Sequence, residues 1–137
     1  MKRLLLDTNI ILDIALKREP HFELSSKIFE LIDKKRIIGY ITASTVTDIY
    51  YISRKEKGNE IAIEFISNLI EIVDVIGVDK STIIKALKSN LKDFEDAVQV
   101  LAAENYEIEI IVTRNKSDFL NSGLEILTPK ELIDSQN

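Results

Sequence analysis

Cysteine is absent from this sequence, and histidine occurs once. Without cysteine, neither disulfides nor thiolate ligands can form, so we expect a reducing compartment, the cytoplasm. Zinc is disfavoured as well, because zinc sites are built mainly from cysteine and histidine. No apolar run reaches the roughly 20 residues of a membrane span, and the N-terminus lacks the pattern of a secretory signal. We therefore expect no membrane association.

Linkers, repeats and low-complexity tracts are also missing. The chain has only 2 prolines and 4 glycines in 137 residues, and they do not gather into a linker, so we expect a single domain over residues 1–137. No glycine-rich phosphate loop is present, which excludes the common nucleotide-cofactor enzymes. The net charge of −5 argues against broad nonspecific binding to nucleic acid, which favours basic surfaces.

Apolar strands alternate with amphipathic helices along the chain. This order is typical of an α/β fold with a central parallel sheet covered by helices on both faces, a three-layer α/β/α arrangement with four to five strands. The strand at residues 3–6 is apolar on both faces, as buried parallel strands are. The predicted strands cover residues 3–6, 37–43, 72–78, 109–113 and 124–127. The predicted helices cover about 10–18, 22–35, 45–55, 60–70, 80–88, 92–105 and 129 onward, with Asn9, Ser44, Asp79 or Ser81, and Thr128 as caps.

Acidic residues recur where these strands end and where the following helices begin. In open α/β sheets, ligands bind beyond the carboxyl ends of the strands, which share one edge. Asp7 ends the first strand, and Asp93 and Asp96, three residues apart, share one face of a helix that starts near this edge. The same edge should receive Asp48, Asn115 and Asp118.

Carboxylates gathered at one place repel each other unless a cation neutralises them. Oxygen ligands suit Mg²⁺ or Mn²⁺, and Mg²⁺ usually takes one or two carboxylates and completes its shell with water. Such ions bridge phosphate oxygens and lower the pKa of a bound water, which can then attack phosphorus. Such ions would also allow a protein with a net charge of −5 to act on nucleic acid, because the metal rather than a basic surface would contact the phosphate.

Each acid also has an ordinary structural interpretation. Asp7 could cap the first helix, Asp48 could be solvated, and Asp118 could cap a short turn. Asp93 could cap its helix, with Asp96 as a first-turn acid that complements the helix dipole. The recurrence of acids at the right ends of successive elements favours a common site.

The runs LLLDTNIILDI, ITASTVTDIYYI, DFEDAVQVLAAE, IIVTRNKSDF and LEILTPKEL together resemble the PIN-domain family, which includes VapC-type toxins. The resemblance extends from residue 3 to about residue 133. It implies a metal-dependent ribonuclease with an acidic pocket at the carboxyl edge of a parallel sheet. In one respect the sequence departs from the family pattern: its second motif usually carries Glu, where this chain has Asp48.

Residue by residue, the resemblance implies Asp7 and Asp96 as metal ligands, and Asp7, Asp48, Asp96 and Asp118 as the catalytic set. The supporting residues are Thr8, Asn9, Asp93, Thr113 and Asn115. Because its side chain is one CH₂ shorter than Glu, Asp48 is expected to reach the ion through water. The substrate-binding residues are not identified, although Arg54, Lys55, Arg114 and Lys116 are candidates for phosphate contacts.

Two other functions compete with the ribonuclease. A catalytically weak or inactive PIN-fold module that binds protein is the stronger alternative, because Asp48 replaces Glu. A phosphoacceptor domain of the receiver type would need a second acid beside Asp7 and a lysine after the last strand, and neither is evident. The partners implied are single-stranded or structured RNA, an antitoxin protein and a second copy of the chain. Tyr50, Tyr51 and Ile52 form a candidate apolar interface.

Overall fold

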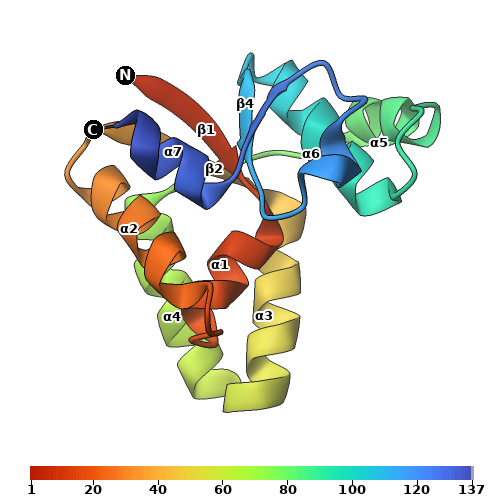
Figure 1. The fold of residues 1–137 in the computed structure, drawn as a ribbon. Helices are drawn as coiled ribbons and strands as arrows, with labels where there is room; N and C mark the ends of the chain where they lie inside the picture. Colours follow the sequence, from red (N-terminus) through yellow and green to blue (C-terminus); the bar gives the residue numbers. More distant parts are fainter. Residues whose placement is uncertain (137) are drawn as a thin grey trace.

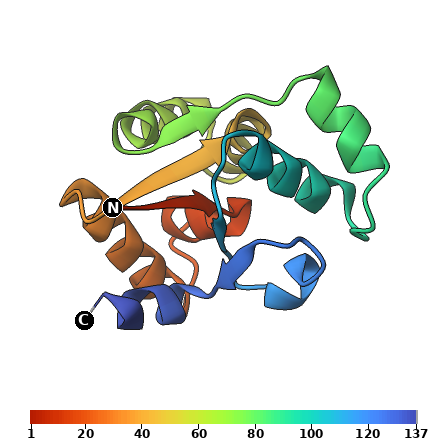
Figure 2. The ribbon, with the colours of Figure 1, turned by 90° about the horizontal axis from the view of Figure 1, so that it is seen from above.

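A five-stranded parallel sheet lies at the centre of the protein (Figure 1). The computed structural model describes residues 1–136. The strands are β1 (Lys2–Leu6), β2 (Ile37–Thr42), β3 (Asp74–Ile76), β4 (Ile110–Val112) and β5 (Glu125–Leu127). Their order across the sheet is β3-β2-β1-β4-β5, and every neighbouring pair is parallel (Figure 2). The predicted sheet is therefore confirmed, with five strands.

Helices cover both faces of this sheet, and β1 is buried between them. Leu4 and Leu6 belong to the core on one face, whereas Leu5 points into the core on the other. The first face is covered by α1 (Thr8–Ala15), α2 (Phe22–Asp33), α3 (Ala43–Lys57), α4 (Asn59–Ile72) and α7 (Pro129–Ser135). The second face is covered by α6 (Phe94–Asn105) and the 3₁₀ turn η1 (Lys116–Phe119), and α5 (Lys80–Leu87) packs on α6. The three predicted layers are confirmed.

The direction of the chain across the sheet reverses beside β1. From β1 the chain proceeds through β2 to β3, and then crosses to the other side of β1 to form β4 and β5. In open α/β sheets, the crevice at the carboxyl ends of the strands beside such a reversal is the usual ligand site. The topology therefore points to the ends of β1 and β4.

The first helix differs from its prediction at both ends. It begins at Thr8, with Asp7 rather than Asn9 at the N-cap position, and it ends at Ala15 rather than near Arg18. Lys17 has a φ of 50°, a left-handed conformation through which an α-helix cannot continue. The helix therefore stops two residues before this turn, and Asn9 lies in its first turn.

The cap of α3 was also predicted wrongly. Thr42, not Ser44, caps this helix by accepting a hydrogen bond from the Thr45 N–H at 3.1 Å. Asp79 caps α5 in the same way, and Thr128 forms a complete capping box with Glu131 at the start of α7, as the sequence indicates. The other predicted boundaries lie within two residues of the observed ones. Among residues 1–136, no helix is both long and apolar enough to span a bilayer.

Candidate active site

A cavity of about 350 Å³ opens at the carboxyl edge of the sheet. Its walls come from the end of β1 and the start of α1, from α3, from the first turns of α6, and from the connection after β4. The residues that line it are Asp7, Thr8, Asn9, Leu12, Asp48, Ile52, Asp93, Glu95, Asp96, Gln99, Asn115 and Asp118. We call it the acidic cavity. Every catalytic, metal-binding and supporting residue predicted from the sequence lines it except Thr113, which contacts Asp7.

Asp7 is buried at the base of this cavity, with 5% of its surface exposed. Gln99 donates from Nε2 to Asp7 Oδ1 at 3.0 Å, and Thr113 donates from Oγ1 to Asp7 Oδ2 at 2.8 Å. Although Asp7 occupies the N-cap position of α1, its side chain makes no capping hydrogen bond. The capping interpretation is therefore wrong, and the two donors fix the direction of the carboxylate. Each of its oxygens keeps a lone pair for a further partner.

Gln99 was missed in the sequence, although it completes this arrangement. It lies one helical turn after Asp96 on α6 and is 4% exposed. A polar residue within the apolar run of this helix is the signal that could have identified it. Thr113, which was predicted as a supporting residue, also accepts a hydrogen bond from the Asn115 N–H at 3.0 Å. Thr113 thus connects the backbone after β4 to the carboxylate that ends β1.

Hydroxyl and amide groups hold the opposite wall. The Thr8 hydroxyl lies 2.9 Å from that of Thr45, which in turn accepts a hydrogen bond from Thr42 at 3.1 Å. Asn9 accepts a weak hydrogen bond from Arg18 Nη1 at 3.4 Å. The contact with Thr45 restrains the first turn of α1 against α3, and the contact with Arg18 links it to the turn after α1. Thr45 and Arg18 are further residues that the sequence did not reveal.

The two acids at the start of α6 have different surroundings. Asp93 caps the helix by accepting a hydrogen bond from the Asp96 N–H at 3.0 Å, so its structural interpretation holds even though it lines the cavity. Asp96 makes no such contact and is half-buried. Burial, followed by the charges of Asp93, Asp7 and Asp118, raises the pKa of Asp96 to about 7. Burial is thus the main cause of the shift in the pKa of Asp96, and the neighbouring acids add to it.

Two acids from different elements, Asp48 and Glu95, line the cavity and interact through their charges. Burial raises the pKa of Asp48, which is half-buried on α3 and is not the freely solvated residue of the ordinary interpretation. The charge of Asp48 is in turn the main cause that raises the pKa of Glu95. Glu95 was not predicted as a site residue. Asp118, in η1, is exposed; Asn115, not Asp118, holds the N-cap position of that turn.

This donor set fits a hard divalent cation. The described residues that line the cavity include several carboxylates but no lysine or arginine. Burial, together with the repulsion from neighbouring carboxylates, raises the pKa of Asp96. Within residues 1–136, no three acidic or histidine side chains come close enough to enclose a cation by themselves. Mg²⁺ commonly takes only one or two carboxylates and keeps several waters. Asp7 and Asp96 could supply those two.

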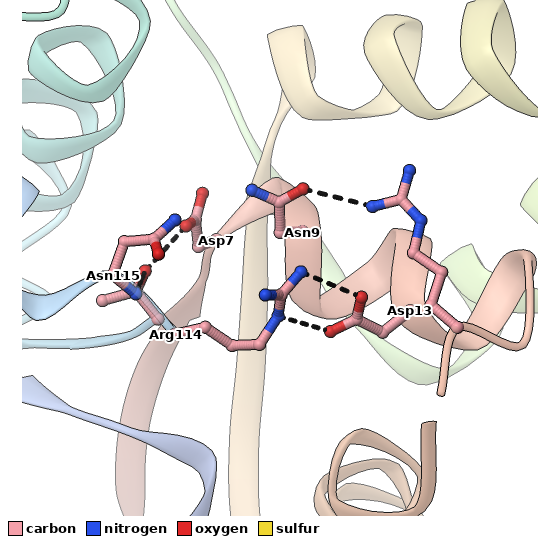
Figure 3. Close-up of polar contacts among 7 residues, drawn as sticks. Asp7, Asn9, Asp13, Arg114 and Asn115 are labelled. Atoms are coloured by element: carbon pink, nitrogen blue, oxygen red, sulfur yellow. Dashed lines mark hydrogen bonds and ion pairs between the residues drawn. The ribbon is translucent and has the colours of Figure 1, made fainter. Parts of the chain in front are cut away.

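The predicted phosphate-binding residues have other partners. Arg114 makes a two-pronged ion pair with Asp13, at 2.8 and 3.2 Å, and Asp13 is fully buried (Figure 3). Lys116 contacts both carboxylate oxygens of Glu131, at 3.1 and 3.2 Å. The positive groups of Arg54 and Lys55 lie over the rings of Tyr50 and Tyr51, respectively. Arg114 thereby ties the loop that carries Thr113 and Asn115 to α1.

The candidate apolar interface on α3 is smaller than the sequence suggested. Tyr51 is 56% exposed and Tyr50 is half-buried, but Ile52 packs against the core and also lines the acidic cavity. Ile49 is fully buried. The exposed part of this surface therefore consists of the two tyrosines.

With this geometry in place, comparison with protein families assigns the chain. A family model described as the PIN domain matches residues 3–117, so the protein belongs to the PIN-domain family. Comparison with curated protein sequences finds no match.

Solved structures share the fold at low sequence identity. A chain of VapBC2 from Rickettsia felis, bound to a DNA fragment from its promoter, has a TM-score of 0.72 and 16% identity, covering 92% of this chain and 98% of that one. A chain of DNA-bound VapBC from Salmonella typhimurium has a TM-score of 0.70 and 20% identity, covering 94% and 99%. VapC20 from Mycobacterium tuberculosis, a sarcin–ricin loop cleaving toxin, has a TM-score of 0.65 and 12% identity, covering 79% and 86%.

The raised pKa of Asp96 predicts a stability that depends on pH. Because the folded protein binds this proton more tightly than the unfolded chain does, stability without metal should fall as the pH rises from about 4 to about 7. Asp96→Asn should remove this contribution and stabilise the metal-free protein at pH 8 by on the order of 1 kcal/mol, after allowance for solvent screening. Urea unfolding in EDTA at pH 5 and pH 8 measures the effect. A variant as sensitive to pH as the wild type would contradict the prediction.

Arg114→Ala should leave the Asp13 carboxylate buried without a partner. Removing one member of a buried ion pair typically costs about 3–5 kcal/mol, and we expect the lower end because the Arg114 side chain is 24% exposed. Lys116→Ala is the matched control, since it breaks an exposed ion pair two residues away and should change stability by less than about 1 kcal/mol. Denaturant unfolding compares the two variants. Equal losses would mean that the pair with Asp13 contributes no more than a surface contact.

Proposed function

We propose that this protein is a metal-dependent endoribonuclease that hydrolyses phosphodiester bonds in RNA, and that it is the toxin of a toxin–antitoxin pair. One observation carries the proposal: in a chain of the PIN-domain family, acids from β1, α3, α6 and η1 converge on one cavity around the buried, oriented carboxylate of Asp7. The fold likeness to VapBC chains and to a toxin that cleaves the sarcin–ricin loop supports the same activity.

Asp7 and Asp96 are the residues that would hold Mg²⁺ or Mn²⁺. Bound there, the ion would lower the pKa of a water and offset negative charge on the phosphate. The hydrogen bonds from Gln99 and Thr113 keep the Asp7 carboxylate directed into the cavity, as groups behind metal ligands commonly do. Asp96 would be held in its ionised form by the cation, against the repulsion from the neighbouring acids.

The remaining acids would handle the attacking water. Asp48 and Asp118 approach the cavity from α3 and from η1, so their carboxylate oxygens could orient a water molecule and accept its proton. Burial raises the pKa of Asp48, which makes its carboxylate a stronger base. Thr8, Asn9, Asp93 and Asn115 would support this arrangement through their positions around the ligands.

Single-stranded RNA is the substrate form that we favour. The chain carries a net charge of −5, and the four basic side chains that the sequence offered for phosphate contacts have acidic or aromatic partners. Gripping a duplex requires many basic phosphate contacts, whereas a flexible strand can enter a small cavity. An antitoxin partner, a second copy of the chain and a cytoplasmic location belong to the same proposal.

Binding of the metal should stabilise the folded protein. A ligand that binds only the folded state stabilises it by about 2.7 kcal/mol at a hundredfold excess over its Kd. Thermal melts with and without Mn²⁺ should therefore differ, and Asp7→Asn should blunt the increase. Asp33→Asn, which changes an exposed acid on α2, should keep it. Identical melting temperatures for the wild type with and without Mn²⁺ would refute metal binding.

Cleavage of RNA should require Mg²⁺ or Mn²⁺, stop with EDTA, and fail with Ca²⁺, because Ca²⁺ is a larger ion with a less strict coordination geometry. Asp7→Asn and Asp96→Asn should each lower the rate by about a hundredfold or more. Asp48→Glu should preserve or raise it, because glutamate restores the residue that the family motif usually carries. Gel assays on a mixed RNA pool measure these rates.

The double variant Asp7→Asn/Asp96→Asn controls for a contaminating nuclease, since cleavage that survives in it cannot come from this site. An Asp48→Glu variant as inactive as Asp96→Asn would contradict the assigned role of Asp48. If the wild type binds Mn²⁺ tightly but does not cleave RNA whichever metal is added, the protein is instead a binding module. This is the alternative that the Asp48 substitution favours.

A further inference from the structure

A second hollow adjoins the acidic cavity between α3, α5 and α6. Its volume is about 160 Å³, and we call it the side pocket. Its apolar walls are Val78, Ile83, Phe94 and Val98, and its polar rim includes Ser44 and Thr45. Thr8, Asp48, Glu95 and Gln99 line both the side pocket and the acidic cavity. A substrate whose reacting group lies in the acidic cavity could therefore place an adjacent group in the side pocket.

The walls and size of the side pocket suit a flat ring. A cavity of roughly 150 Å³ lined by apolar side chains can take a benzene-sized molecule, and the side pocket is of this size. Phe94, in the first turn of α6, lines the side pocket and is 46% exposed, so part of its side chain is accessible to a ligand there. Bases of single-stranded RNA stack on aromatic side chains of this kind.

Gln99, which lines both hollows, has one polar atom without a hydrogen-bond partner among the described residues. The Nε2 of Gln99 is committed to Asp7, which fixes the amide, and its Oε1 is buried without a hydrogen bond in the structure. Gln99 itself is 4% exposed. A buried acceptor without a donor costs about 1–3 kcal/mol, so the arrangement favours an occupant that brings an N–H group. Nucleobases carry such donors on their edges.

We propose that the side pocket binds one unstacked nucleobase of single-stranded RNA, beside the phosphodiester that reacts in the acidic cavity. Phe94 is the stacking residue, and Gln99 Oε1 and the Ser44 hydroxyl meet the polar edge of the base. This inference rests on the proposed function, because it assumes that RNA is the substrate. It goes further by assigning a residue, Phe94, to recognition of a base, whereas the sequence offered candidates only for phosphate contacts.

Binding of a short single-stranded RNA tests the pocket without catalysis. Anisotropy is measured in Ca²⁺, which should not support cleavage. Phe94→Ala should weaken binding about tenfold, within the range for the loss of one stacked base, and Phe94→Tyr, which keeps a ring, should restore it. Leu87→Ala is the matched control, because Leu87 is 68% exposed on α5 and does not line the pocket. Equal affinities of Phe94→Ala and Leu87→Ala would overturn the proposal.

Oligonucleotides with one abasic nucleotide at successive positions sharpen the test. At one position, loss of the base should weaken binding to the wild type about tenfold but should hardly affect Phe94→Ala, because both changes remove the same contact. Equal sensitivity of both proteins at every position would overturn the proposal. Hydrolysis of bis(p-nitrophenyl) phosphate by the wild type tests the phosphodiesterase activity separately. If the wild type does not hydrolyse this compound, the result counts against the proposed function and not against the pocket.

Discussion

The buried carboxylate of Asp7 is the interaction on which the rest of the site depends. A buried charge is costly unless hydrogen bonds compensate for it. Here the two donors are Gln99 and Thr113, which follow Asp7 in the sequence by 92 and 106 positions. β1, α6 and β4 must therefore be correctly packed before Asp7 is satisfied. The two hydrogen bonds that direct the carboxylate into the cavity therefore also stabilise the completely folded state.

The acids gathered at this site lower the stability of the folded protein, because they are partly buried and repel one another. The carboxyl edge of the sheet gathers side chains from four elements, and burial, with the charges of the neighbouring acids in addition, raises the pKa of Asp96 to about 7. Caps and ion pairs hold the surrounding segments in place: Asp93 starts α6, the Thr8 hydroxyl contacts α3, and Arg114 fixes the loop after β4 to Asp13. Without a counter-charge the cavity is destabilising, which is the physical reason to expect a cation there.

Local patterns predicted much of this arrangement. Strand ends and helix starts are readable from the sequence to within about two residues, although the caps of α1 and α3 were misplaced. The sheet, the layers and the convergence of Asp7, Asp48, Asp96 and Asp118 could therefore be predicted. The end of α1 could not, because it depends on the left-handed conformation of Lys17. Nor could the contacts of Gln99 and Arg114, whose partners lie 92 and 101 residues away. Such pairs follow from packing and leave no signal in the spacing of residues.

The central claim is that the acidic cavity holds a divalent cation between Asp7 and Asp96. Crystals of the wild type soaked in Mn²⁺ test it most directly, because anomalous scattering locates the ion itself. The account predicts an anomalous peak in the acidic cavity, in contact with both carboxylates, and no such peak in crystals of Asp7→Asn. A well-ordered cavity that stays without a peak, or a manganese ion bound only elsewhere on the surface, would contradict it.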